Sequence, residues 1–348
     1  MRTDERMDER KKQVLAAIVQ DYILTGEPVG SRTITRRYNL GVSAATIRNE
    51  MADLEEMGLL EQPYTSAGRV PSDYGYRYYV DCLMAPERLT REEVEYVYQR
   101  YNQKMLEIEQ VLEETARLVS EMTAYTAVAM GPNQDHAVLE QVQIVPVQAT
   151  NKALLVAITS TGIVEHRIFT ISDNITPEDL ARISQVLNTN LQGIALEAMQ
   201  RAVLKDIYRE ITEHRSLVKL ITDLLQQILV LEGNEKVYLD GIINILSQPE
   251  FKDWDKVKEI LAFFEREDSL RRIFNASPGG GLAIRIGQEN KEEGIDKCSV
   301  VTISYAVEGK IIGKVGLLGP TRMHYPRVIS VLQCVADSLS RSLQQFYR

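Results

Sequence analysis

Cysteine and histidine are scarce in this chain, which limits the metal and thiol chemistry open to it. The three cysteines lie far apart without a CxxC pair, which excludes a disulfide framework and a cysteine zinc site; we expect reduced packing residues. The four histidines lack metal-ligand spacing, and no Cys, His and carboxylate arrangement marks a nucleophilic triad. The sequence therefore predicts no metal, no cofactor and no enzymatic activity.

Long apolar runs are also missing. The first dozen residues alternate acids and bases, unlike a secretory signal, and runs such as 153–158 are far too short to cross a bilayer. With 11 prolines and 20 glycines, the chain has too few of these residues for long disordered stretches. We therefore expect a folded cytoplasmic protein that does not enter a membrane.

An overall excess of positive charge is missing as well. The formal net charge of −9 argues against a protein that coats nucleic acid by general electrostatics, because phosphate contacts need Lys and Arg. The charge is unevenly spread, however: residues 28–49 contain no acid but contain Arg32, Arg36, Arg37 and Arg48. A local basic face on an acidic molecule is typical of a compact DNA-reading module.

The N-terminal residues have the pattern of a helix-turn-helix. Apolar residues at three-to-four spacing predict a helix over 9–25, and a short helix follows over 31–38 with Ser31 as its cap. Asn39 and Gly41 favour a turn because both tolerate positive φ. Ser43 then caps a third helix with a buried apolar line. Helix, short turn and helix together predict a DNA-binding fold.

The third helix supplies the residues for reading DNA. A helix fits the major groove, where Arg48 or Asn49 pairs with base edges, Thr46 bonds a base or phosphate, and a small residue such as Ala44 allows close approach. Residues 61–70 read as a hairpin wing with Arg69 near its tip. The predicted DNA-binding residues are Arg32, Arg36, Arg37, Ser43, Ala44, Thr46, Arg48, Asn49 and Arg69.

A plainer interpretation is a solvated three-helix bundle with exposed arginines. The acid-free stretch, the Ser43 cap and the following hairpin agree with one another, so DNA binding is favoured, although some of the arginines are bystanders. One such module reads too few base pairs for operator selectivity, which predicts a homodimer on an inverted repeat.

Beyond the N-terminal module, the pattern is that of an α+β protein. A heptad-like seam over 94–122 predicts a long helix whose partner, in its own chain or another, is left open. Strands are expected within 127–171 and again within 282–318, with helical spacing dominant between them and a final helix over 325–347. Strands, a helical block and strands again predict an insertion into a single sheet domain.

Three segments resemble the HrcA family of heat-inducible transcription repressors. They are SAATIRNEMADLEEMGLL at 43–60, TSAGRVPSDYGYRYYVD at 65–81 and GKVGLLGPTRMHYPRVI at 313–329. The resemblance implies a repressor of chaperone operons that binds double-stranded DNA at the inverted repeat called CIRCE as a dimer and is controlled by the GroEL chaperonin. It also implies a winged helix-turn-helix at 1–80, a GAF-like domain at 90–190 plus 278–348, and a mostly helical dimerisation domain inserted at 191–277.

Two other functions compete with this one. A metabolite-responsive repressor of a metabolic operon would hold a small ligand in its sheet domain. An enzyme fused to a DNA-binding domain would need a convergent set of catalytic polar groups, which the sequence does not present.

Overall fold

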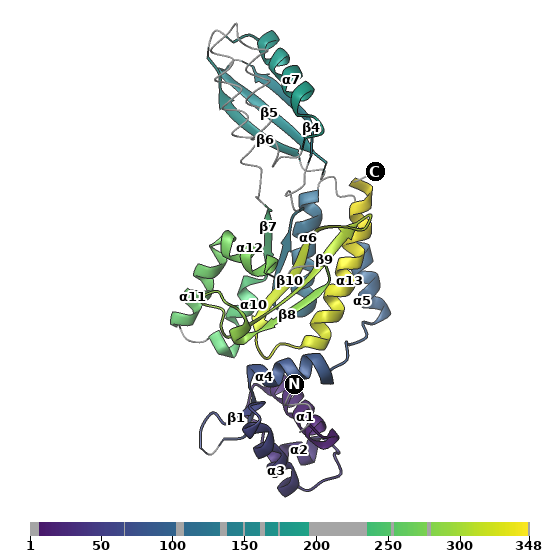
Figure 1. Ribbon diagram of the computed structural model, residues 1–348, viewed down its shortest axis with the longest axis vertical. Coiled ribbons are helices and arrows are strands. Elements are labelled where there is room, and N and C mark those ends of the chain that lie inside the picture. The colour runs from purple at the N-terminus through teal and green to yellow at the C-terminus, as the bar shows by residue number, and fades with distance from the viewer. Residues whose placement is uncertain are drawn as a thin grey trace.

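The computed structural model describes most of the chain, and its described parts follow one another along a single axis (Figure 1). The N-terminal module, residues 7–83, lies at one end, a five-stranded sheet with helices forms the middle, and a three-stranded sheet lies at the other end. The described ranges are 7–65, 67–101, 108–132, 138–148, 150–160, 164–172, 175–194, 235–251, 254–276 and 280–346.

The N-terminal module contains three helices, a two-stranded hairpin and a short helix that leads into the rest of the chain. Asp8 caps the first helix by accepting a hydrogen bond from the Lys11 N–H, and Gly26 ends it at a φ of 69°, which favours glycine. The elements are α1 (Glu9–Thr25), α2 (Ser31–Arg37), α3 (Ala44–Glu56), β1 (Leu60–Glu61), β2 (Val70–Pro71), α4 (Asp73–Tyr78) and the π-helical segment η2 (Tyr79–Leu83).

One local prediction in this module is wrong. Ser31 does not cap α2: it is the first residue of the helix and is buried, and the extended residue before it is Gly30, which has no side chain to offer. The predicted turn after α2 is present, and within it Gly41 has a positive φ whereas Asn39 does not.

The middle of the molecule, which we call the body, is built on a sheet of neighbouring antiparallel strands in the order β7-β3-β10-β9-β8. Its strands are β3 (Thr126–Met130), β7 (Val237–Asp240), β8 (Leu282–Ile286), β9 (Cys298–Val307) and β10 (Lys310–Pro320). The predicted strands within 282–318 are confirmed, but β7 lies inside the block expected to be helical.

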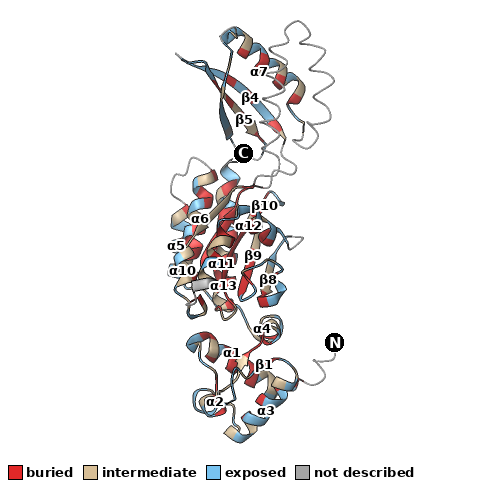
Figure 2. Ribbon diagram, turned by 90° about the vertical axis from the view of Figure 1, so that its left-hand side faces the viewer, coloured by how far each residue is buried: buried red, intermediate tan, exposed pale blue. Residues whose placement is uncertain are grey.

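Helices cover both faces of the body's sheet. Alternate residues of β3 point to opposite faces, so Ala127 and Ala129 join the core under one helical layer, and Val128 and Met130 join the core under the other. Figure 2 shows buried residues concentrated between these layers. The first layer has α5 (Arg91–Tyr101), α6 (Ile108–Thr123) and α13 (Tyr325–Leu343); the second has α10 (Ile242–Leu246), α11 (Trp254–Phe264) and α12 (Glu267–Asn275).

The predicted long helix over 94–122 is instead two helices, α5 and α6, that lie side by side. The Tyr101 hydroxyl is 2.7 Å from the Thr115 hydroxyl, although 14 positions along one straight helix would separate them by about 21 Å. Arg100 also pairs with Glu114 and Glu121 of α6. Both helices pack on α13 of their own chain, so the partner of the seam is intramolecular.

The other predicted strands form a separate sheet, which we call the distal sheet, and this overturns the prediction that they share one sheet with 282–318. It has the order β4-β5-β6 and its own core, closed on one face by α7, which Thr176 caps through a capping box. The elements are β4 (Leu139–Val147), β5 (Lys152–Thr159), β6 (Val164–Thr170) and α7 (Pro177–Leu191).

The chain leaves the body's sheet and returns to it at one point. Met130 of β3 is paired with Val237 of β7, and the Gly131 N–H donates to the Lys236 carbonyl at 2.8 Å. Residues 237–275 therefore belong with the body rather than with the predicted insertion, because β7 completes the sheet and α10–α12 cover it. The helical segment expected at 196–231 lies outside the described residues. None of the described helices is long and apolar enough to cross a membrane.

Candidate nucleic-acid interface

Helix α3 carries four of the nine predicted DNA-binding residues, and a fifth, Ser43, sets its start. The Ser43 hydroxyl accepts a hydrogen bond from the Thr46 N–H at 3.2 Å and lies 3.0 Å from the Thr46 hydroxyl, so the predicted cap is confirmed. Ile47 anchors the buried side of the helix, while Arg48 and Asn49 are exposed on the outside. Ala44 and Thr46 are half-buried near the start of the helix.

Acidic side chains on α3 would repel phosphates unless they were neutralised. Glu50 and Asp53 each lie 3.0 Å from the Lys11 ammonium of α1, and Glu55 lies 2.8 Å from Arg69. The hydrogen bonds to Glu50 and Asp53 raise the pKa of Lys11 above its usual value. These pairs neutralise part of the negative charge of α3, and Arg48, the basic residue of the helix, forms no ion pair among the described residues.

The hairpin of β1 and β2 is fastened to the segment before α2. Val29 and Arg69 exchange two backbone hydrogen bonds of 2.8 and 2.9 Å. Gly68 allows this approach, because a Cβ there would overlap the Val29 carbonyl. Arg69 is thus at the base of the hairpin, not near its tip as the sequence suggests, and its guanidinium is paired with Glu55.

Tyr64 is an exposed aromatic residue in the hairpin loop, and the sequence interpretation did not name it. Its side chain is 63% exposed. Gln62 shapes the loop by donating from Nε2 to the carbonyls of Thr65 and Ala67 at 3.1 and 3.3 Å, and the Ala67 N–H donates to the Tyr64 carbonyl. The available signal was an aromatic residue between turn formers in a predicted hairpin.

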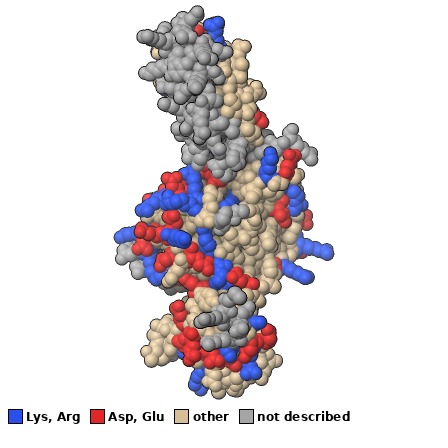
Figure 3. All heavy atoms as spheres, viewed as in Figure 1, with Lys and Arg blue, Asp and Glu red and all other residues tan. Residues whose placement is uncertain are grey.

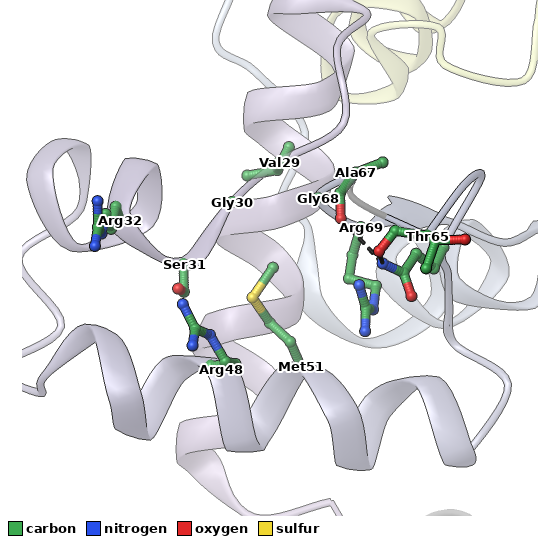
Figure 4. A pocket seen from close by; sticks show the side chains of 11 residues that line it. Val29, Gly30, Ser31, Arg32, Arg48, Met51, Thr65, Ala67, Gly68 and Arg69 are labelled. Atoms are coloured by element: carbon green, nitrogen blue, oxygen red, sulfur yellow. Dashed lines mark hydrogen bonds between the residues drawn. The ribbon is translucent and has the colours of Figure 1, made fainter.

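A groove of about 510 Å³ lies between the start of α2, α3 and the hairpin. Figure 4 shows Arg48 reaching from α3 towards Ser31 at the start of α2, with Arg32 on α2 and Arg69 on the hairpin side. The structure therefore brings three of the predicted basic residues around one hollow. The lining residues are Val29, Gly30, Ser31, Arg32, Arg48, Met51, Gln62, Thr65, Ala67, Gly68 and Arg69.

The arginines of this region differ in whether they are paired with an acidic side chain. Within the described part of the chain, Arg32, Arg36 and Arg48 form no ion pair, and each is exposed. Arg37 donates to the buried Asp21 at 2.6 Å, and this hydrogen bond raises the pKa of Arg37. Arg36 and Arg37 do not line the groove.

The groove suits a polyanion better than a metal ion. In the view of Figure 3, acids and bases are intermixed over the body, so no single-sign field covers it. Within the described ranges, no group of three or more His, Cys, Asp or Glu side chains is placed to hold a metal ion. Arginine side chains around a hollow beside an exposed helix can contact both phosphates and base edges.

The whole chain is similar to known transcription repressors. A family model described as HrcA protein C terminal domain matches residues 109–329. A heat-inducible transcription repressor HrcA from Moorella thermoacetica is 72% identical over 343 residues, 99% of this chain and 100% of that protein. A repressor of the same name from Desulforamulus reducens is 46% identical over 344 residues, 99% of each chain.

A solved structure supports the overall fold. It is a protein described as hypothetical, determined at 2.2 Å resolution, and it is similar to this chain with a TM-score of 0.61 and 23% identity. The match covers 98% of this chain and 99% of that one. The likeness extends over the α+β architecture as a whole.

Proposed function

This chain belongs to the HrcA family of heat-inducible transcription repressors, and from that premise we propose that it represses chaperone operons by binding an inverted-repeat operator as a homodimer. The family is one of repressors and not of enzymes, as the sequence predicts. The operator in this proposal is the CIRCE repeat.

In this proposal the N-terminal module is a winged helix-turn-helix. Helix α3 enters the major groove, Arg48 pairs with base edges, and the β1–β2 hairpin is a wing that brings Tyr64 to the neighbouring backbone. The observation that carries the proposal is the groove between α2, α3 and the hairpin, where Arg32 and Arg48 form no ion pair with any described residue. Arg36 adds a phosphate contact outside that groove.

Binding to matched duplexes tests this assignment. We expect Arg48→Ala to weaken binding to an operator duplex by about 1 to 3 kcal/mol and to weaken binding to a scrambled duplex much less, because a base contact penalises the correct sequence most. Arg117→Ala, a change of equal charge on α6, is the control. Equal affinity of the wild-type chain for both duplexes would contradict the proposal, and equal losses for Arg48→Ala would move Arg48 to a backbone role.

We place the dimer contact on the face of the distal sheet that α7 does not cover. Ala153, Leu155 and Ala157 of β5 face α7, so the alternate side chains face away from it. On that face Val164 is 53% exposed and Ile168 is 64% exposed. An apolar sheet face of this kind indicates an interaction surface, and a two-fold dimer matches an inverted repeat.

We assign the domains on the same basis. The body is the GAF-like domain, and residues 132–235 are the inserted dimerisation domain. The pairing of β3 with β7 supports these limits, since neighbouring strands can hold the two ends of an insertion together. The helical part of the insertion expected at 191–277 is thereby reduced, because α10–α12 pack on the body.

We further propose that the GroEL chaperonin keeps the repressor active. The body's sheet joins strands that are distant in sequence, since residue 130 pairs with residue 237 and residue 126 with residue 318. Chains with such pairing fold slowly through aggregation-prone intermediates, which a chaperonin can rescue.

A further inference from the structure

The N-terminal module and the body share one hydrophobic core rather than meeting across a loose linker. A single cluster of buried residues runs from Leu15 and Ile47 in the module to Val328 and Leu332 of α13. At the interface between the module and the body, the Tyr76 ring of α4 lies 6.1 Å from the Tyr325 ring of α13. The module is therefore packed against the body in one orientation.

Arg77 makes the first set of polar contacts across this interface, which we call the first clamp. Its Nε donates to Glu289 at 2.9 Å, a second nitrogen bonds the same carboxylate, and that nitrogen also donates to the Ile284 carbonyl at 2.6 Å. This two-pronged contact joins α4 to the end of β8 and the turn after it. A planar guanidinium makes it possible, whereas one ammonium group would not.

Asp73, one turn before Arg77, reinforces the first clamp. Its carboxylate accepts a hydrogen bond from the Gln288 N–H at 2.9 Å. The approach requires glycine at 287, where φ is +53° and a Cβ would overlap the Asp73 carboxylate. The turn after β8 is thus shaped to receive α4.

Arg322 forms a second clamp on the other side of the module. Its side chain is 14% exposed, pairs with Glu250, and donates to Gln248 at 3.2 Å and to the Ile23 carbonyl at 3.4 Å. Ile23 is in the last turn of α1, and α1 packs against α3. The two clamps hold the module at α4 and at α1.

We propose that Arg77 and Arg322 are positioning residues that fix the angle at which each module presents α3, and so restrict the repressor to one spacing between operator half-sites. The inference rests on the proposed function. Each base pair inserted between the half-sites moves one of them by about 3.4 Å and turns it by about 35°. Two rigidly held modules cannot follow that change, whereas two released modules can.

The experiment measures affinity for a series of duplexes by fluorescence anisotropy with the full-length chain. The duplexes are a single half-site, the inverted repeat at its native spacing, and the same repeat with one base pair added or removed. The variants are Arg77→Ala, Arg322→Ala and Gly287→Ala, the last of which releases Asp73 without a change of charge. Arg117→Ala on α6 removes an arginine that does not touch the module and is the matched control.

We expect the wild-type chain and Arg117→Ala to bind the altered spacings about tenfold more weakly than the native one, which corresponds to about 1.4 kcal/mol. The clamp variants should lose less than about threefold, with unchanged half-site affinity. Arg77→Lys, which keeps the charge but loses the two-pronged contact, should resemble Arg77→Ala.

The outcomes separate the clamp from the function beneath it. If the wild-type chain binds the inverted repeat at its native spacing no more tightly than a scrambled duplex, the proposed function fails. If that binding is selective but the clamp variants retain the wild-type spacing profile, or the wild-type chain itself tolerates altered spacing, the clamp proposal is overturned. Variants are compared only where half-site affinity equals that of the wild type, which removes those that fail to fold.

Discussion

The four arginines of residues 28–49 carry the same charge but meet different neighbours. Arg37 is paired with the buried Asp21 and so ties the end of α2 to α1. The adjacent Arg36 is exposed and forms no ion pair among the described residues. One arginine therefore serves the fold of the module, while the charge of the other lies at the surface without an acidic partner among the described residues.

This difference predicts different consequences for two neighbouring substitutions. Arg37→Ala should lower the free energy of unfolding, because it leaves the Asp21 carboxylate buried without its partner. Arg36→Ala should change that free energy by less than about 0.5 kcal/mol. It should instead reduce the slope of log DNA affinity against log salt concentration by about 1, which is the change expected for one lost phosphate contact. Urea unfolding and titrations at several salt concentrations measure both, and equal unfolding free energies for the two variants would show that the Asp21 pair is unimportant.

Helices and strands whose form depends on near neighbours follow directly from the sequence. The apolar spacing predicts α1 and α13, and the Ser43 cap predicts the start of α3. Each of these signals lies within a few residues of the element that it describes. The position of Arg48 on the exposed side of α3 follows for the same reason.

The reversal between α5 and α6 did not follow from the sequence. Both helices turn their apolar side to α13, so their apolar residues have the same spacing that one continuous helix would have. Periodicity reports which side of a helix is buried, and it does not report the direction of the chain.

The sequence pattern also did not reveal which strands pair with one another. The alternation along β4 and β5 predicts two strands but does not say that they form a sheet apart from β9 and β10. The short strand β7 has four residues of intermediate burial and therefore no clear alternation. The position of Arg69 was misjudged because the register of a hairpin with two-residue strands decides which residues lie at its base.

The attachment of the hairpin predicts the effect of a single methyl group. Gly68→Ala should displace the hairpin from Val29, destabilise the chain by about 1 to 3 kcal/mol through overpacking, and weaken operator binding. Gly30→Ala adds the same group two residues before Arg32, where a Cβ has open space apart from Thr33 at 3.9 Å, and serves as the control for stability, since Gly30 itself lines the groove. Thermal unfolding compares the two variants, and operator titration compares Gly68→Ala with the wild type. If Gly68→Ala were as stable as Gly30→Ala and bound operator like the wild type, the fastening of the hairpin to Val29 would be unimportant.

The distal sheet projects from the body at the opposite end from the N-terminal module, which suits it to join two copies (Figure 1). Ile168→Glu places a charge on its exposed apolar face and should shift the repressor from dimer to monomer, because burying an unpaired carboxylate is costly. Gln185→Glu adds the same charge to the exposed side of α7, which covers the opposite face of the sheet, and is the control. Sedimentation velocity gives the oligomeric state. A dimer that survives Ile168→Glu would move the contact to another surface.

The proposed control by the chaperonin depends on the folding of the whole chain. The body cannot close its sheet until β3 has met both β7, beyond the distal sheet, and β10 near the end of the chain. Loops of this length make closure slow and leave apolar strands exposed in the meantime. Heat or a shortage of free chaperonin would then lower the amount of repressor able to bind its operator, with no small ligand required.

Incubation of the purified chain at rising temperature, with and without GroEL and ATP, tests this account. We expect the fraction able to bind operator to fall with temperature and to be restored by the chaperonin, because a change of about 1 to 2 kcal/mol in stability alters active abundance several-fold. Chaperonin without ATP is the control, since it can hold the chain but not release it. An active fraction that stays high and equal in all arms would separate this repressor from chaperonin control and favour regulation by a small ligand.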